Sequence, residues 1–139
     1  MKNRRLLVDT SAWIAGFRRD GPAELHALLR EALDRDQVAT TPLVVLELLQ
    51  GCKTPQEFEA LEARLASLEQ LPLHDLNWQQ LYRMGFGLRR RGVTVPTVDL
   101  LIAFLAMSHG YVLLHHDRHF RLLAAHVTLE AIDFLPRGP

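Results

Sequence analysis

The sequence predicts an α/β fold in which a parallel sheet carries helices on both faces, formed by a single domain over residues 1–139. Short aliphatic runs, typical of strands buried on both sides, alternate along the chain with longer stretches of helical periodicity. A length of 139 residues suits one domain and suffices to bury about two-thirds of the unfolded surface. No repeats, low-complexity segments or internal linkers suggest a second unit.

The first third of the chain is expected to form two strands and two helices. A compact aliphatic run predicts a strand at 4–8, and apolar residues at helical spacing predict a helix directly after it, at 10–17. A Gly-Pro pair then opens an amphipathic helix that extends to about Asp34. Residues 37–40 are expected as the second strand.

Two helices with matching start signals come next. In each, a threonine at the N-cap position precedes a proline at the first helical position, where the missing amide hydrogen costs nothing. The first helix starts at Thr41 and extends to Gly51, and the second starts at Thr54. Glu57 follows Thr54 by three residues, as in a capping box. The aliphatic segment 71–73 is expected as the third strand.

The chain from residue 75 onward is expected to contain three helices and two strands. Asp75 or Asn77 caps a helix that reaches Arg91 and ends at Gly92. The remaining elements, in order, are an apolar helix that Thr97 caps, a buried strand at 111–114, a short helix at 118–125 and a last strand at 127–129.

Composition restricts the classes of function. The formal net charge at pH 7 is zero, which argues against a binder of nucleic acid that works through bulk charge. It does not exclude a nucleic-acid enzyme, because local basic patches such as 89–91 coexist with a neutral total. The single cysteine, Cys52, excludes an internal disulfide and fits a reducing cytosol. No apolar run reaches the roughly 18 residues of a membrane-spanning helix, so we expect a cytoplasmic protein without membrane association.

Four acidic residues lie inside apolar runs that contain no lysine or arginine, directly beside such runs, or, for the last of them, two histidines after one. They are Asp9, Glu47, Asp99 and Asp117. Burying a carboxylate costs several kcal/mol or more unless it is paired, protonated or bound to a cation. Asp9 and Asp117 follow predicted strands, and ligands of parallel sheets bind at the carboxyl ends of strands. If the four acids converge, they form an oxygen-rich site for a hard divalent cation.

Each aspartate also has a purely structural explanation. Asp9 and Asp117 could cap the helices that follow them, and Asp99 lies in a first helical turn, where the helix dipole favours an acid by less than about 1 kcal/mol. Glu47 lies in the middle of a predicted helix between leucines, so it cannot be a helix cap. Its structural explanations are a buried ion pair or a position on an exposed helix face. One shared site explains all four acids more simply than four separate explanations do.

Three histidines next to Asp117 form a second candidate cluster. They are His115, His116 and His119. His115 and His119, at i and i+4 if helical, could bind a transition metal, or the cluster could move protons in a metal-free cleavage of RNA through the 2′-hydroxyl. A solvated turn with titratable side chains is the preferred interpretation, since no further Cys or His cluster supplies ligands.

Four aromatic residues are candidates for the core or a dimer interface at least as much as for base stacking. They are Trp13, Trp78, Tyr82 and Phe86. The arginines at 89–91 are typical of a solvated helix end, with contact to RNA phosphate as the alternative.

Four segments around the acids resemble, in order, the motifs of PIN-domain ribonucleases, specifically VapC-type toxins of bacterial toxin–antitoxin pairs. The segments are 7–14, 41–48, 98–103 and 113–120. All four acids match in order and type, and the resemblance covers essentially the whole chain.

The resemblance implies a three-layer α/β/α PIN-like fold and a Mg²⁺- or Mn²⁺-dependent endoribonuclease, the toxin of a type II toxin–antitoxin system. It also implies a homodimer that a small cognate VapB-type antitoxin neutralises. By the same resemblance Asp9, Asp99 and Asp117 hold the metal, and Glu47 completes the catalytic set or activates the attacking water. Thr10 or Ser11 would add a hydroxyl to the site.

Two departures from the family pattern stand out. His115 stands two residues before the last aspartate, where the family often has Thr or Ser, which leaves the arrangement around Asp117 open. Ala15 and Gly16 follow the first motif where the family often has an acid. Two other functions also remain open: a housekeeping PIN nuclease of RNA processing, and a non-catalytic module whose acids hold a structural cation or cap helices.

Overall fold

The structure is a computed structural model that describes residues 4–137. Its centre is a parallel sheet of five strands in the order β3-β2-β1-β4-β5. The strands are β1 (Leu6–Val8), β2 (Val38–Thr40), β3 (Glu69–Gln70), β4 (Val112–His115) and β5 (Ala131–Asp133).

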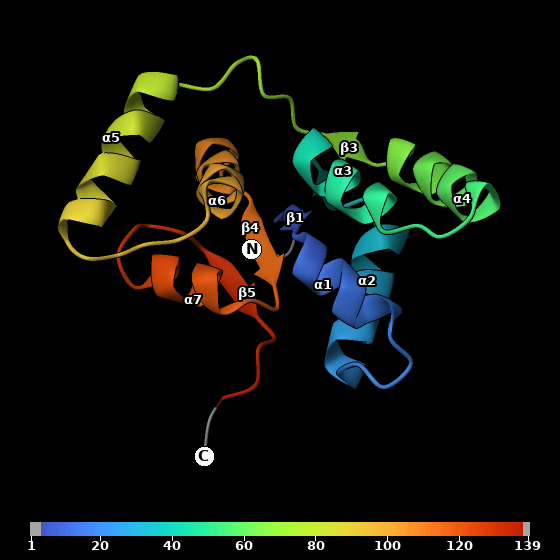
Figure 1. Cartoon of the computed structure of the whole chain (residues 1–139). Helices are drawn as coiled ribbons and strands as arrows, with labels where there is room; N and C mark the ends of the chain where they lie inside the picture. The colour runs from blue at the N-terminus through green and yellow to red at the C-terminus, as the bar shows by residue number, and fades with distance from the viewer. Residues whose placement is uncertain (1–3, 138–139) are drawn as a thin grey trace.

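Seven helices connect the strands within the described residues. They are α1 (Thr10–Phe17), α2 (Ala23–Asp34), α3 (Pro42–Gln50), α4 (Pro55–Ala66), α5 (Trp78–Arg90), α6 (Thr97–His109) and α7 (Arg118–Ala124). Helices α1 to α4 lie on one side of the strands and α5 to α7 on the other (Figure 1). The predicted α/β fold with helices on both faces of a parallel sheet is therefore confirmed.

The strand order reverses at the centre of the sheet. The chain moves outward from β1 to β2 and β3, then returns to place β4 on the other side of β1. Leu7 of β1 pairs with Ala39 of β2 and with Leu113 of β4. Ligands of open α/β sheets bind at this kind of switch point, outside the carboxyl ends of the strands. Asp9 follows β1 directly and Asp117 follows β4 by two residues, so both lie at this point.

The core explains the two most apolar segments of the sequence. All three residues of β1 are buried between neighbouring strands and two helical layers. Residues 102–106 of α6 are all buried as well, because this helix packs between β4 and the outer helices α5 and α7. A helix buried on most sides needs no polar stripe, which is why α6 shows none.

Two expected strands are displaced in the structure, so those predictions were wrong. The third strand is β3 at 69–70, and not 71–73; the Leu71 amide still donates to the Thr40 carbonyl at 2.8 Å, but Pro72 has no amide hydrogen to continue the ladder. The last strand is β5 at 131–133, and not 127–129, whose apolar side chains pack on the core without strand pairing.

The helix caps agree with the sequence at some positions only. Thr54 accepts a hydrogen bond from the Glu57 amide at 3.1 Å, as a capping residue should. Asn77, and not Asp75, caps α5 through a bond from the Gln80 amide. Thr97 is not a cap: it is the first helical residue of α6, and Pro96 occupies the N-cap position.

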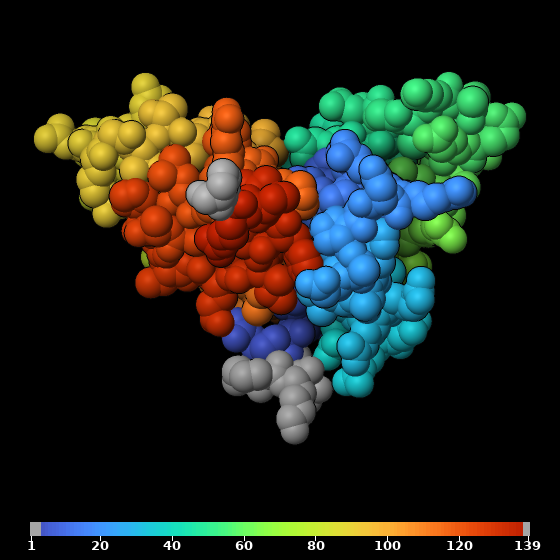
Figure 2. All heavy atoms as spheres, turned by 90° about the horizontal axis from the view of Figure 1, so that it is seen from below, coloured from blue at the N-terminus to red at the C-terminus, as the bar shows by residue number. Residues whose placement is uncertain are grey.

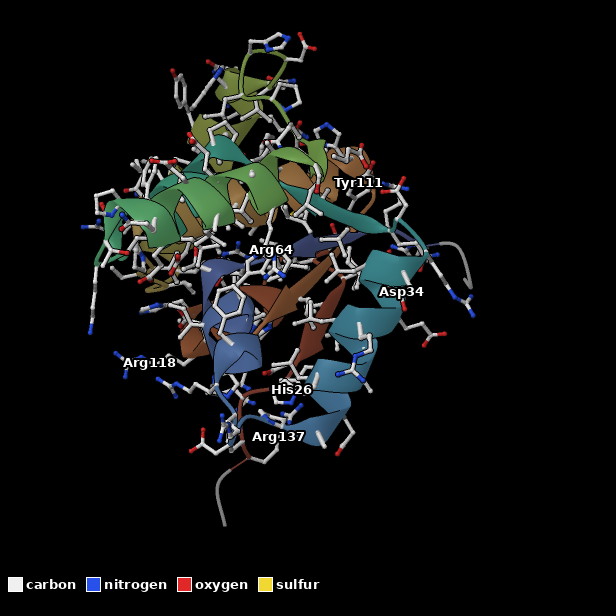
Figure 3. The ribbon with its side chains drawn as sticks, turned by 90° about the vertical axis from the view of Figure 1, so that its right-hand side faces the viewer. His26, Asp34, Arg64, Tyr111, Arg118 and Arg137 are labelled. Carbon is white, nitrogen blue, oxygen red and sulfur yellow. The ribbon has the colours of Figure 1, made fainter. Side chains whose placement is uncertain are left out.

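Two outer helices give the molecule its outline. Seen from below, the outer helices α5 (yellow) and α4 (green) project from opposite ends of the molecule (Figure 2). The side that carries α1, α2 and α4 faces the viewer in Figure 3, where His26 and Arg64 are labelled on it. None of the helices within residues 4–137 combines the length and the apolar character needed to cross a membrane.

Candidate active site

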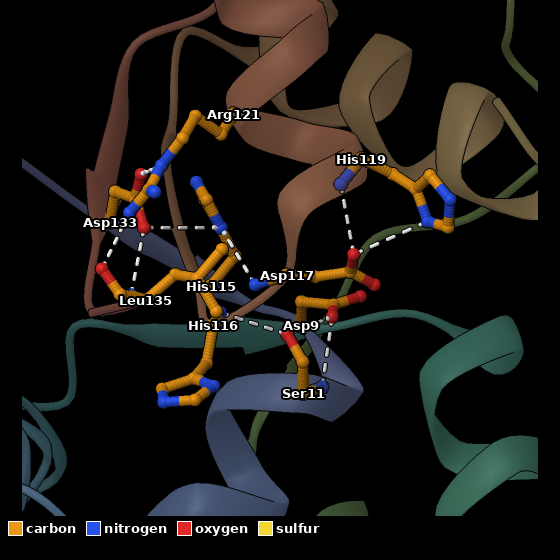
Figure 4. A network of polar contacts seen from close by, with 9 residues as sticks. All are labelled: Asp9, Ser11, His115, His116, Asp117, His119, Arg121, Asp133 and Leu135. Atoms are coloured by element: carbon orange, nitrogen blue, oxygen red, sulfur yellow. Dashed lines mark hydrogen bonds and ion pairs between the residues drawn. The ribbon is translucent and has the colours of Figure 1, made fainter. Parts of the chain in front are cut away.

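Asp9 is buried at the start of α1, where it does act as the N-cap. Its Oδ2 accepts hydrogen bonds from the Ser11 amide at 2.8 Å and from the Ser11 hydroxyl at 2.5 Å (Figure 4). Ser11 Oγ in turn accepts from the His116 amide at 2.9 Å, which links the segment after β1 to the segment after β4. The capping role therefore fixes the carboxylate in place, and it does so through only one of the two oxygens.

Glu47 extends from α3 toward the same region. Its Oε1 accepts a hydrogen bond of 2.7 Å from the Thr10 hydroxyl, at the first residue of α1. The side chain is half-buried, and within residues 4–137 it forms no ion pair with lysine or arginine, so neither structural alternative from the sequence describes it. The hydroxyls of Thr10 and Ser11 thus each hold one acid of the cluster.

Asp99 and Asp117 meet on either side of one histidine ring. The Nδ1 of His119 lies 3.1 Å from Asp99 Oδ2 and 3.2 Å from Asp117 Oδ1. Asp117 is the N-cap of α7, and its Oδ1 also accepts from the His119 amide at 2.9 Å. One ligand atom from each of these three residues lies within 4.8 Å of the other two, a spacing that could hold a metal ion.

The electrostatics show that the four acids share one environment. The pKa of Asp99 is raised to about 6, first by burial and then by the charges of Asp117, Asp9 and Glu47, while His119 opposes the rise. Burial also raises the pKa of Asp9 above its ordinary value, against the lowering effect of the Ser11 hydrogen bonds, and Glu47 and Asp117 contribute to the rise. The structure therefore brings Asp9, Glu47, Asp99 and Asp117 together, as the sequence led us to expect.

The interpretation of the histidines as a solvated turn was wrong for His115. This residue belongs to β4, is fully buried, and packs its ring against Phe120 with the centroids 5.3 Å apart. Its Nδ1 accepts a hydrogen bond of 3.2 Å from the Asp117 amide, so the histidine that stands where the family often has Thr or Ser holds the backbone of the last acid. Burial lowers the pKa of His115, which favours the neutral ring that this bond requires.

His115 and His119 do not form the i, i+4 pair of metal ligands that was considered from the sequence. One lies on a strand and the other in α7, and the His115 ring faces Asp133, whose Oδ1 is 4.0 Å from Nδ1. Arg121 holds Asp133 through a bond of 2.6 Å (Figure 4). Of the three histidines only His119 reaches the acids, and the Asp-x-His spacing at the start of α7 was the signal in the sequence.

The donors at this site suit a hard divalent cation. Carboxylate oxygens are the preferred ligands of Mg²⁺ and Mn²⁺. The pKa of Asp99 is raised first by burial and then by the charges of the neighbouring acids, and a bound cation would offset both effects. Within the described part of the chain, no lysine or arginine forms an ion pair with any of the four acids. The residues present therefore fit a cation.

Comparisons with known proteins agree with this architecture. The model of the PIN domain family matches residues 6–125. The chain is 32% identical over 134 residues to the VapC ribonuclease Mb1587 of Mycobacterium bovis, an alignment that covers 93% of this chain and 98% of the relative. It is 31% identical over 132 residues to ribonuclease VapC5 of Mycobacterium tuberculosis, covering 91% and 93% of the two chains.

Solved structures with the same fold include toxin–antitoxin complexes. A chain of VapBC2 from Rickettsia felis, bound to a DNA fragment from the promoter, matches with a TM-score of 0.75 at 17% identity, over 92% of this chain and 97% of that one. A chain of VapBC-5 from Mycobacterium tuberculosis matches with a TM-score of 0.64 at 27% identity, over 94% and 98%.

Proposed function

The chain belongs to the PIN domain family and, within it, to the VapC ribonucleases, and from this premise we propose that it is an endoribonuclease toxin of a type II toxin–antitoxin pair. Its reaction is the hydrolysis of RNA phosphodiester bonds. The observation that carries the proposal is the meeting of four acids from separate segments at the switch point of the sheet. Relatives named as ribonucleases, similar over more than nine-tenths of the chain, support it.

Asp9, Asp99 and Asp117 would hold a divalent cation, Mg²⁺ or Mn²⁺. When bound, such an ion supplies an activated water and offsets charge on the phosphate. Glu47 would accept the proton of the attacking water, and the Thr10 hydroxyl keeps its carboxylate oriented for that task. The Ser11 hydroxyl and amide likewise hold the Asp9 carboxylate in position. Two adjacent residues of α1 therefore position two of the four acids.

The partners follow from the same proposal. RNA is the substrate, and a VapB-type antitoxin is the inhibitor, as the similarity to solved VapBC toxin–antitoxin complexes suggests. Three exposed aromatic residues at intervals of four along α5 support a homodimer: Trp78, Tyr82 and Phe86. We place the protein in the cytoplasm, where RNA and a co-expressed antitoxin are available.

Removing single carboxylates tests the proposal. Purified protein free of antitoxin is incubated with RNA and Mn²⁺, alongside Asp9→Asn and Asp99→Asn. Both variants should lose more than about a hundredfold in cleavage rate, because each removes a charged ligand and leaves the shape of the site intact. Asp75→Asn, at an acid whose side chain is 82% exposed, is the matched control and should cleave normally.

The same variants separate this function from its rivals. Expression of the wild-type chain should arrest growth, while Asp9→Asn and Asp99→Asn should not. Full cleavage by both variants would reject the proposal. A protein that cleaves no RNA in Mn²⁺ would instead support a binding module.

A further inference from the structure

The acidic site contains a nitrogen atom at its centre. The Nδ1 of His119 is buried between Asp99 and Asp117, at 3.1 and 3.2 Å from one oxygen of each. Figure 4 marks the contact between this nitrogen and the Asp117 carboxylate with a dashed line. An imidazole between two carboxylates can be either a simple ion pair or part of a set of metal ligands.

The geometry favours a set of ligands. Although two oxygens are near enough, Nδ1 forms no well-aligned hydrogen bond with any described residue. Ligand atoms of one metal ion lie close together without hydrogen bonds between them, because each points at the metal position and not at the neighbouring ligand. In an octahedral site with metal–ligand distances of about 2.1 Å, adjacent ligands are about 3.0 Å apart. The separations of 3.1 and 3.2 Å are close to that value.

The fold fixes the backbone of His119 beside the acids. The His119 amide donates to Asp117 Oδ1 at 2.9 Å as part of the α7 cap, so the backbone at this position cannot move away without breaking the start of the helix. The next residue, Phe120, is fully buried and holds the same turn against the core. Asp99 is brought to the ring by α6, which packs on α7.

We propose that Nδ1 of His119 is a direct ligand of the divalent cation, beside Asp99 and Asp117, and that the site therefore prefers Mn²⁺ to Mg²⁺. Imidazole nitrogen is a poor ligand for Mg²⁺, which demands oxygen ligands, but a good one for the first-row transition metals. This inference rests on the proposed function for the existence of the cation site. It adds a nitrogen ligand and a metal preference that the four acids do not imply.

Electron paramagnetic resonance of bound Mn²⁺ tests the inference without any RNA. Untagged, antitoxin-free protein is titrated with Mn²⁺, and electron spin echo modulation reports whether ¹⁴N is coordinated directly. The wild type should show ¹⁴N modulation. His119→Ala should lose it, with Mn²⁺ affinity falling about tenfold or more and Mg²⁺ affinity changing less than about threefold.

Two further variants keep the result unambiguous. His116→Ala removes a neighbouring imidazole that points away from Asp9 and Asp117 (Figure 4), so it should retain both the modulation and the affinity. His119→Asn puts an amide oxygen near the position of Nδ1, so it should bind Mn²⁺ without ¹⁴N modulation even if the alanine variant does not fold.

The outcomes separate this inference from the proposed function. Wild-type protein that binds Mn²⁺ without ¹⁴N modulation, or modulation that persists in His119→Asn, overturns the inference and means that the ring forms an ion pair only. RNA cleavage in the same samples would leave the proposed function standing. Nitrogen-coordinated Mn²⁺ in a protein that cleaves no RNA would overturn the proposed function alone, and a protein that binds no Mn²⁺ would overturn both the inference and the proposed cation site.

Discussion

Asp99 occupies an environment that disfavours its charge. Its side chain is 16% exposed and lies near three other acids, so its pKa is about 6 in the folded protein against 3.8 for an ordinary aspartate. Between about pH 4 and pH 6 the folded chain binds a proton that the unfolded chain has released. The stability of the metal-free protein should therefore fall as the pH rises through this interval and stay level above it.

Asp99→Asn should remove that penalty. At pH 7.5 the metal-free variant should be more stable than the wild type by as much as about 3 kcal/mol, since one pKa unit corresponds to about 1.4 kcal/mol. At pH 4 the two should be nearly equal. Urea denaturation in EDTA at both pH values measures this difference. Equal stability at pH 7.5 would mean that Asp99 carries no such penalty.

Ser11 connects the two segments that carry Asp9 and Asp117. Its hydroxyl donates to Asp9 and accepts from the His116 amide, so Ser11→Ala leaves one buried acceptor and one amide less satisfied. We expect a loss of about 1–2 kcal/mol in unfolding free energy together with slower RNA cleavage. Ser67→Ala removes a serine bond to the Arg64 carbonyl at an exposed helix end and should cost less than about 0.5 kcal/mol. An equal loss in both variants would contradict a special role for Ser11.

The sequence could predict the four acids but not the contacts through which Ser11 and His119 meet them. A single charged residue near an apolar run can be recognised from the sequence alone, and this pattern predicts Asp9, Glu47, Asp99 and Asp117 as site residues. The roles of Ser11 and His119 depend on partners contributed by other elements, the His116 amide and the Asp99 carboxylate. Nothing in the local sequence indicates which elements will meet.

Helix α5 carries three exposed aromatic residues. Trp78, Tyr82 and Phe86 are 40, 63 and 66% exposed, and helical spacing places them on one stripe. A stripe on a single helix can pack against its own copy across a twofold axis, which is the commonest symmetry of homodimers. Aromatic side chains of this size contribute strongly to interfaces.

Tyr82→Glu combined with Phe86→Glu should convert the proposed homodimer to a monomer. Both positions are largely exposed within one chain, so the melting temperature of the monomer should change little. Analytical ultracentrifugation over a range of concentrations measures the change. Phe58→Glu, at an exposed aromatic residue of α4, is the control and should remain dimeric. A double variant that stays dimeric would place the interface elsewhere.

Helices were easier to predict than strands for a physical reason. Apolar periodicity and the cap residues around Thr54 and Asn77 are local, and they put the helices within a residue or two of their observed bounds. A strand of two or three residues is defined by its neighbour instead. Strand β3 exists because 69–70 pair with 39–40, and β5 because 131–133 pair with 113–115, although more aliphatic segments lie close by.

At the scale of the whole molecule, the strand order creates the site. Because the order reverses between β1 and β4, the carboxyl ends of these strands lie side by side, and Asp9 and Asp117 follow them. Helices α3 and α6 approach the same edge from opposite faces of the sheet and add Glu47 and Asp99 (Figure 1). Elements from both helical layers and the sheet must therefore be in place before the acids meet.

The central claim is that these acids hydrolyse RNA with the help of a divalent cation, and the chemical ends of the cleaved RNA test it most directly. Purified, antitoxin-free protein is incubated with a defined RNA in Mn²⁺, with and without excess EDTA, and the new ends are identified by mass spectrometry. Attack by water predicts linear phosphate and hydroxyl ends that appear only without EDTA. Cleavage that persists in EDTA and leaves 2′,3′-cyclic phosphates would contradict the account, because it would mean that the 2′-hydroxyl attacks without a metal.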